Sequence, residues 1–269
     1  MSESKKQQKH FYLRNNDALM NSTKLSMKAK QSILLSKAEN TVDAYQSDWD
    51  DFVDWCTYQK VSYFPATPET IVNYINDLAD YAKANTISRR ISAISENFNA
   101  SGQRNNPCMT PIVKQALRGI RRLKGTFQQG KTPVLLEDIE DIIDCMAKLD
   151  VPELQLLRDK AILLIGFMGA FRRSEIAAIT VENLQFSPQG VEIFVASSKA
   201  DQEGQGAVVA IPHLSGSPLD AVRALQQWLR ASGITEGPVF RGFTKNMSLR
   251  KTAISDKMIS EIVKKYISL

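Results

Sequence analysis

The spacing of apolar residues limits what this chain can fold into. From residue 36 to residue 124, and through most of residues 134–269, apolar side chains recur at three- and four-residue steps, the spacing of one buried helix face. Only around residues 190–198 and 206–212 do they alternate with a period of two, as in a strand. The polar, glycine-containing segment 198–206 suits a hairpin tip. We therefore expect a mainly α fold with a small antiparallel β-sheet.

Breaks in this pattern divide the chain of 269 residues, which is long enough for one large or two medium globular domains. Residues 1–35 lack firm periodicity, which predicts a flexible N-terminal arm or a weakly held helix. Residues 36–124 predict a helical domain. Residues 125–133 contain Gly125, Gly130 and Pro133 and predict a linker, so that residues 134–269 form a second domain.

The first domain carries recognisable helix signals. Thr67 as N-cap and Pro68 at the first helical position predict the start of one helix, and Asn85 is expected to cap the next. The side chains expected to be buried are Val42, Tyr45, Trp49, Phe52, Val53 and Cys56, then Ile71, Tyr74, Ile75 and Leu78, then Ile87, Ile91 and Ile94, and finally Val113, Ala116, Leu117, Ile120 and Leu123. In the second domain, Gly233 is expected to end a helix over residues 217–233.

Positive charge is concentrated in one part of the chain. The net charge of +5 favours an anionic partner only mildly, but residues 97–136 contain no Asp or Glu at all. In the helix expected over residues 110–125, Lys114, Arg118, Arg121 and Arg122 fall on one face. Such a row is often an ordinary solvated face. Because solvated faces usually mix both signs of charge and this one does not, we favour phosphate binding.

Two adjacent arginines, Arg172 and Arg173, stand inside the otherwise apolar segment 169–179. An unpaired buried charge is costly, so each guanidinium needs a carboxylate or a ligand anion beside it. Glu175 can satisfy one of them. The second arginine then needs an anion from outside the chain, and this predicts an anionic ligand.

Other features narrow the protein class. The 3 cysteines are far apart and near no histidine cluster, so we expect reduced thiols, no zinc site and no cofactor. The N-terminus is polar, and no apolar run approaches the length that spans a membrane. We expect a cytoplasmic, nucleoid-associated protein with no membrane partner.

Three motifs in order resemble the tyrosine recombinase (phage integrase) family, and its Cre-like members most. They are GFMGAFRRSEIAAITVENL, then SSKADQEGQGAVVAIP, then LQQWLRASGITEGPVFR, and the similarity extends back over residues 64–94. The resemblance implies a helical core-binding (SAM-like) domain over residues 36–124 and the first part of a tyrosine-recombinase catalytic domain over residues 134–269. It also implies that the protein clamps duplex DNA and takes part in DNA integration and recombination.

The resemblance assigns roles to three catalytic positions. Arg172 matches the family's first catalytic arginine, which contacts the scissile phosphate, and Glu175 matches the acidic residue that supports it. Lys199 matches the mobile lysine that protonates the leaving 5′ oxygen. Each has an ordinary alternative, since Arg172 and Glu175 can form a simple i,i+3 ion pair and Lys199 can be a solvated hairpin lysine. The family order and spacing favour the catalytic reading.

The expected DNA-binding residues lie in both domains. The resemblance implies that Arg89 and Arg90 face the major groove from the helix of residues 86–98, because the family's matching positions do so, and the inward positions of this helix are taken by isoleucines. The remaining residues of this group are Lys114, Arg118, Arg121, Arg122, Lys124, Arg241 and Lys245.

One half of the family's catalytic set is absent from these residues. Neither of the 2 histidines, His10 and His213, is followed by arginine at the third position, so the family's His-x-x-Arg motif is missing. Tyr266 lies in a helix that precedes that motif in family members, so we interpret it as a packing residue.

Three hypotheses follow from this departure. The favoured one is a recombinase that lacks its C-terminal segment, is inactive in this form and self-associates on DNA more weakly than its relatives. The second is a non-catalytic DNA-binding protein or regulator derived from a recombinase. The third, a helical interaction module, is disfavoured by the acid-free basic stretch.

Overall fold

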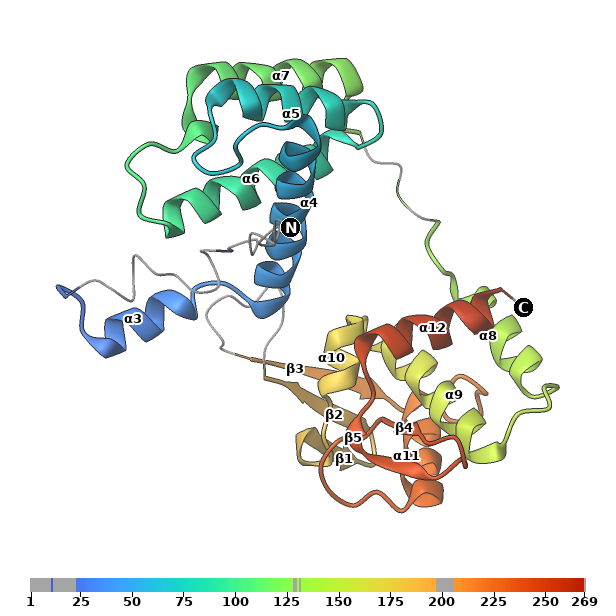
Figure 1. The fold of residues 1–269 in the computed structure, drawn as a ribbon. Helices are drawn as coiled ribbons and strands as arrows, with labels where there is room; N and C mark the ends of the chain where they lie inside the picture. Colours follow the sequence, from blue (N-terminus) through green and yellow to red (C-terminus); the bar gives the residue numbers. More distant parts are fainter. Residues whose placement is uncertain (1–10, 12–22, 128–129, 131, 197–205, 269) are drawn as a thin grey trace, which may run out of the picture. The chain divides into compact units, whose positions relative to one another are not determined.

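A computed structural model describes Phe11 and residues 23–127, 130, 132–196 and 206–268. The chain divides into two compact units, residues 1–130 and residues 131–269, which are called unit 1 and unit 2 below. Figure 1 shows unit 1 as a group of helices and unit 2 as helices combined with short strands. The expected mainly α fold with a small antiparallel sheet is confirmed.

The regular elements described in unit 1 are all helical. Its elements are α3 (Met27–Leu34), α4 (Glu39–Gln59), α5 (Pro68–Ala79), α6 (Ala84–Ala100), the 3-10 turn η1 (Pro107–Met109) and α7 (Pro111–Lys124). Helix α4 packs on α6, and α5 packs on α7. The core between them is aromatic, because Trp49 lies against Phe52 and against the edge of Phe98. The contact between Trp49 and Phe98 thereby joins α4 to α6 in this core.

The helix signals of unit 1 were mostly reliable. Thr67 caps α5 by accepting a hydrogen bond from the Thr70 amide at 3.2 Å, and Pro68 is its first residue, as predicted. The expected cap at Asn85 is wrong, because α6 already begins at Ala84 and Lys83 is its N-cap. The prediction that Leu123 is buried is also wrong, since it is 81% exposed. Ile120 is the last buried residue of α7, so the final turn of that helix has no core beneath it.

Unit 2 combines helices with two small sheets. Its helices are α8 (Leu136–Met146), α9 (Glu153–Met168), α10 (Arg173–Ala178), α11 (Ala221–Ser232) and α12 (Asp256–Ile267), with the 3-10 turn η2 (Val181–Asn183). Its strands are β1 (Leu184–Ser187), β2 (Gly190–Val195), β3 (Ala207–Pro212), β4 (Arg241–Phe243) and β5 (Leu249–Ala253). Gly233 ends α11 in a left-handed conformation, as predicted.

The strands form two antiparallel sheets. The predicted pairing of β2 with β3 is confirmed, with Gly190 opposite Pro212 and Val195 opposite Ala207. Strand β1 adds to the other edge of β2, and β4 pairs with β5 in a separate two-stranded sheet. The sequence did not predict β1, β4 or β5. Strands of three to five residues with almost no buried side chain carry too little alternation to detect.

The core of unit 2 is organised around α9, which packs against α8, α10, α11 and α12. This helix buries two charged residues, Arg158 and Asp159, and the Asp159 carboxylate accepts a hydrogen bond from the Tyr266 hydroxyl at 2.9 Å. Tyr266 is fully buried, as expected for a packing residue. None of the helices described in either unit is long and apolar enough to cross a membrane.

Candidate nucleic-acid interface

The Arg172–Glu175 pair is built into the start of a short helix. Arg172 is the N-cap of α10, and Glu175 is the third residue of the helix. One Glu175 oxygen accepts a hydrogen bond from the Arg172 amide, and the other accepts one from Arg172 Nη1, both at 2.7 Å. A carboxylate that reaches back to the N-cap amide satisfies a donor that the helix leaves unpaired. The same contact therefore orders the helix start and the guanidinium.

The burial of this pair differs from the sequence-based prediction. Arg172 and Arg173 were expected inside a buried segment, but both are exposed, because the chain leaves α9 at Met168 and reaches the surface before α10 begins. The Arg172 side chain is 50% exposed, whereas that of Glu175 is 8% exposed. The buried charge is thus the carboxylate. Glu175 holds Arg172 from the protein side while the guanidinium faces solvent, where an anion can reach it.

The hairpin expected to carry Lys199 begins close to Glu175. Val195 and Ala196, at the end of β2, line the same small hollow as Glu175 and Ile179. Lys199 itself lies outside the described residues, so its expected role stays a prediction. The structure therefore places the end of β2, where the connection that contains Lys199 starts, next to Glu175.

Helix α7 carries the basic face that the sequence predicted. Lys114, Arg118, Arg121 and Arg122 are exposed, while Val113 and Ile120 on the opposite side are buried. Arg121 donates to the Ser88 hydroxyl of α6 through Nη2 at 3.0 Å, and this bond joins the exposed surfaces of the two helices. The last basic residue of the helix, Lys124, donates to the main-chain carbonyl of Ala79 at the end of α5.

The two arginines of α6 have different environments. Arg89 donates from Nη1 to Asp48 at 2.5 Å, and its side chain is 47% exposed. Arg90 is only 17% exposed and donates to Asp51 and to the Tyr74 hydroxyl. The expectation that both arginines lie on an open face is therefore wrong for Arg90. Its guanidinium is drawn inward by partners on α4 and α5.

The two residues expected near β4 also differ from each other. Arg241 donates to the main-chain carbonyls of Pro238 at 2.8 Å and Glu236 at 2.5 Å, so its guanidinium holds a turn of its own chain. Lys245 lies exposed in the connection between β4 and β5. Of the two, only Lys245 is exposed.

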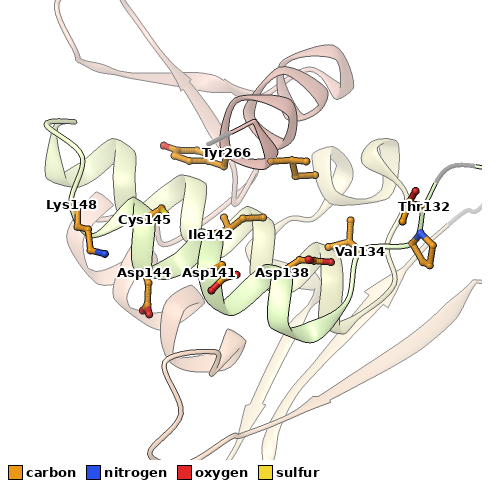
Figure 2. Close-up of a pocket in the computed structure, with 11 residues that line it drawn as sticks. Thr132, Val134, Asp138, Asp141, Ile142, Asp144, Cys145, Lys148 and Tyr266 are labelled. Carbon is orange, nitrogen blue, oxygen red and sulfur yellow. The ribbon is translucent and has the colours of Figure 1, made fainter.

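A larger cavity in unit 2 is lined by acidic residues, which do not suit a DNA phosphate. Figure 2 shows a cavity of about 630 Å³ along α8, with Asp138, Asp141 and Asp144 on that helix and Tyr266 on α12. A row of carboxylates repels a phosphate, so the charge of this cavity does not favour a DNA backbone. Among the residues that the structure describes, no group of three or more His, Cys, Asp or Glu could hold a metal ion.

Comparison with known proteins decides the family. Residues 31–101 match the family described as "Phage integrase, N-terminal SAM-like domain". The chain is 52% identical over 262 residues to the integrase/recombinase XerD homolog of Selenomonas ruminantium, which covers 97% of this chain and 76% of that protein. The chain belongs to the tyrosine recombinase family. It is a recombinase-type protein, and the residues that match the SAM-like domain lie in unit 1.

Solved recombinase structures show the same fold. A lambda integrase dimer bound to a COC' core site matches with a TM-score of 0.56 at 13% identity, over 96% of this chain and 62% of that chain. The XerH site-specific recombinase bound to a difH substrate matches with a TM-score of 0.55 at 11% identity, over 94% of this chain and 72% of that chain. The chain thus spans less than two thirds of the lambda integrase chain and about three quarters of its Selenomonas relative.

Sequence reasoning missed the acidic partners of the α6 arginines. Asp48 and Asp51 lie on α4, and they are separated from Arg89 and Arg90 by 41 and 39 residues. One signal was available, because Asp48 directly precedes the fully buried Trp49 on the inner side of its helix. A carboxylate at the edge of an apolar stripe indicates a paired side chain, although it does not say which cation pairs with it.

Proposed function

We propose that this chain is a DNA-binding member of the tyrosine recombinase family that grips the phosphate backbone through the basic face of α7. The observation that carries the proposal is the exposed row of Lys114, Arg118, Arg121 and Arg122 in a stretch of 40 residues, 97–136, without a single acidic residue. Each such cation that neutralises a phosphate releases a counterion, which supplies affinity for duplex DNA of any sequence.

Unit 2 adds a cation for one particular phosphate. In this proposal Arg172 donates to non-bridging oxygens of the scissile phosphate, and the buried Glu175 carboxylate keeps the guanidinium pointing outward. Lys199 takes the role of the general acid that protonates the leaving 5′ oxygen, because its ammonium group can donate a proton to a departing alkoxide. The identity of 52% with a protein named integrase/recombinase supports this assignment.

The sequence of unit 2 contains one tyrosine, Tyr266, and its hydroxyl is not in an accessible position. Tyr266 is fully buried and donates to Asp159, and burial together with the Asp159 charge raises its pKa. The sequence also contains no His-x-x-Arg motif. We propose that these 269 residues by themselves bind DNA without cleaving it, which both the first hypothesis, a recombinase inactive in this form, and the second, a non-catalytic DNA-binding protein, expect.

The test of the main proposal is the salt dependence of duplex binding. Replacing Arg118 and Arg122 by alanine removes two phosphate contacts, so the slope of log K against log salt should become shallower by about two units. A matched control replaces Lys148 and Lys257, two exposed lysines outside the acid-free stretch, and should keep the original slope. Equal slopes in both variants, or no duplex binding at low salt, would contradict the proposal.

The second test looks for a covalent intermediate. A duplex with a nick near the cleavage position traps any phosphotyrosyl adduct, which then migrates slowly on a denaturing gel. We expect no adduct from this chain. An adduct that disappears in Tyr266→Phe would show that Tyr266 is the nucleophile and that the chain cleaves DNA by itself.

Two further parts of the proposal concern partners. The solved structures similar to this chain include a lambda integrase dimer bound to a core site and a lambda integrase tetramer bound to a Holliday junction. We propose that this chain also self-associates on DNA, more weakly than those relatives, and that it is found with the nucleoid. Comparing the sedimentation of the free chain with that of its duplex complex tests the first point.

A further inference from the structure

The crossing of α4 and α6 contains a buried carboxylate that holds one exposed arginine. We propose that Asp48 is a positioning residue that orients Arg89 for sequence-specific contact with a guanine. This inference rests on the proposed function, because it requires that unit 1 binds duplex DNA. It adds a distinction within the pair of arginines, since it assigns base recognition to Arg89 and a structural role to Arg90.

The Arg89 guanidinium is fixed at one end and open at the other. Nη1 donates to Asp48 Oδ2 at 2.5 Å, and the Asp48 side chain is only 4% exposed. Within the described residues, Nε and Nη2 of Arg89 make no hydrogen bond. Guanine presents two acceptors, O6 and N7, in the major groove, and a pair of parallel guanidinium N–H groups matches them. The Nε and Nη2 edge therefore has the donors that a guanine needs.

Asp48 is itself held in place. Its neighbour Trp49 is fully buried in the core of unit 1, and its second oxygen lies 3.9 Å from Arg90 Nε. Burial raises the pKa of Asp48, against the lowering effect of Arg89 and Arg90. A buried carboxylate stays charged only with cationic partners beside it, so Asp48 requires the contact with Arg89. The same contact fixes the position of the Arg89 guanidinium.

A fixed side chain is an advantage in base recognition. A free arginine loses rotamer entropy when a contact orders it, by roughly 0.5 to 1.5 kcal/mol for a rotamer-rich side chain. The contact with Asp48 orders Arg89 before DNA arrives. It also restricts the directions in which the remaining donors point, and such restriction is what allows one base to be preferred over another.

The surroundings of Arg89 on α6 suit base edges better than phosphates. One helical turn to either side, the exposed residues are Asn85 and Ser92, an amide and a hydroxyl. Such groups donate to and accept from bases, whereas the exposed face of α7 carries Lys114, Arg118 and Arg122. The exposed surface of α6 around Arg89 therefore has the polar groups that contact bases, and the adjoining surface of α7 has the cations that contact phosphates.

The test measures discrimination rather than affinity. Duplexes are first selected from a random-sequence pool by the wild-type protein, and Kd is then measured for the selected duplex and for a shuffled one. We expect Arg89→Ala to lower the ratio of the two Kd values by about 5- to 150-fold, and Asp48→Asn to lower it within the same range. The double variant should lose no more than Arg89→Ala alone, because Asp48 acts only through Arg89.

A matched control separates positioning from stability. Asp51→Asn removes the carboxylate that pairs with Arg90 and Tyr74, at the same helix crossing, without touching Arg89. This variant should keep the wild-type ratio even if it is less stable. Replacing guanines of the selected duplex by 7-deazaguanine removes N7, and should weaken wild-type binding while leaving Arg89→Ala unaffected.

Several outcomes overturn the inference while leaving the proposed function intact. They are an unchanged ratio in Asp48→Asn, additive losses in the double variant, and a pool that yields no preferred sequence although duplex binding persists. If Asp48→Asn does not fold, Asp48→Glu retains the charge but moves the carboxylate by one methylene. A wild-type ratio in that variant also counts against positioning. Absence of binding to any duplex at low salt would instead refute the proposed function.

Discussion

Tyr266→Phe removes a single hydroxyl from the interior of unit 2 and should destabilise that unit measurably. The hydroxyl donates to Asp159 Oδ2 at 2.9 Å, while Oδ1 of the same carboxylate receives two hydrogen bonds from Arg158. Within the described residues, Oδ2 has no other donor. Because Asp159 is fully buried, no solvent replaces the lost partner.

The expected cost follows from the charge of the acceptor. A hydrogen bond to a charged group contributes about 1.5 to 3 kcal/mol, more than a bond between neutral groups. With a urea m-value of about 2 kcal/mol/M, the midpoint of unfolding of unit 2 should fall by about 1 M. The ring itself remains, so no cavity adds to this cost.

The assay must report on unit 2 alone. Of the 3 tryptophans, Trp49 and Trp55 lie in unit 1, and only Trp228 lies in unit 2, where it is fully buried. Labelling with 5-fluorotryptophan gives one fluorine resonance for unit 2, which a Trp228→Phe sample identifies, and urea titration of that resonance gives the midpoint. Tyr58→Phe, at a residue 83% exposed, is the control and should leave the midpoint unchanged. A shift below about 0.2 M in Tyr266→Phe would refute the reasoning.

Two further predictions concern cysteines and the arginine of α10. Burial raises the pKa of Cys56 and of Cys108 to about 12, so at pH 8 a thiol reagent should modify only the half-buried Cys145 in the native protein and all three thiols in denaturant. Modification of three thiols in the native state would contradict the burial of the first two. Arg172→Ala should weaken duplex binding a few-fold and lower the unfolding midpoint of unit 2 only modestly, because the buried Glu175 carboxylate keeps its hydrogen bond from the main-chain amide of residue 172. A lost fold with unaltered affinity would instead make this pair structural.

Most helices of this protein were predictable because their signals are local. The Thr67–Pro68 start and the Gly233 stop depend on backbone geometry within one turn, and the buried face of α4 depends only on residue spacing. Alternation likewise revealed β2 and β3, whose pairing needs only a hairpin. The basic character of α7 is also a property of the sequence, since no acidic residue stands within residues 97–136.

Function at individual side chains depended on partners that are distant in the sequence. Arg89 and Arg90 are adjacent and chemically identical, yet one is half exposed and the other nearly buried, because Asp48 and Asp51 meet them from α4. In the same way, Glu175 is buried while Arg172 is exposed. The apolar sequence around them did not indicate which of the two side chains is buried. Residue spacing determines which face of a helix turns inward, but the burial of a charge is decided by what the fold places against it.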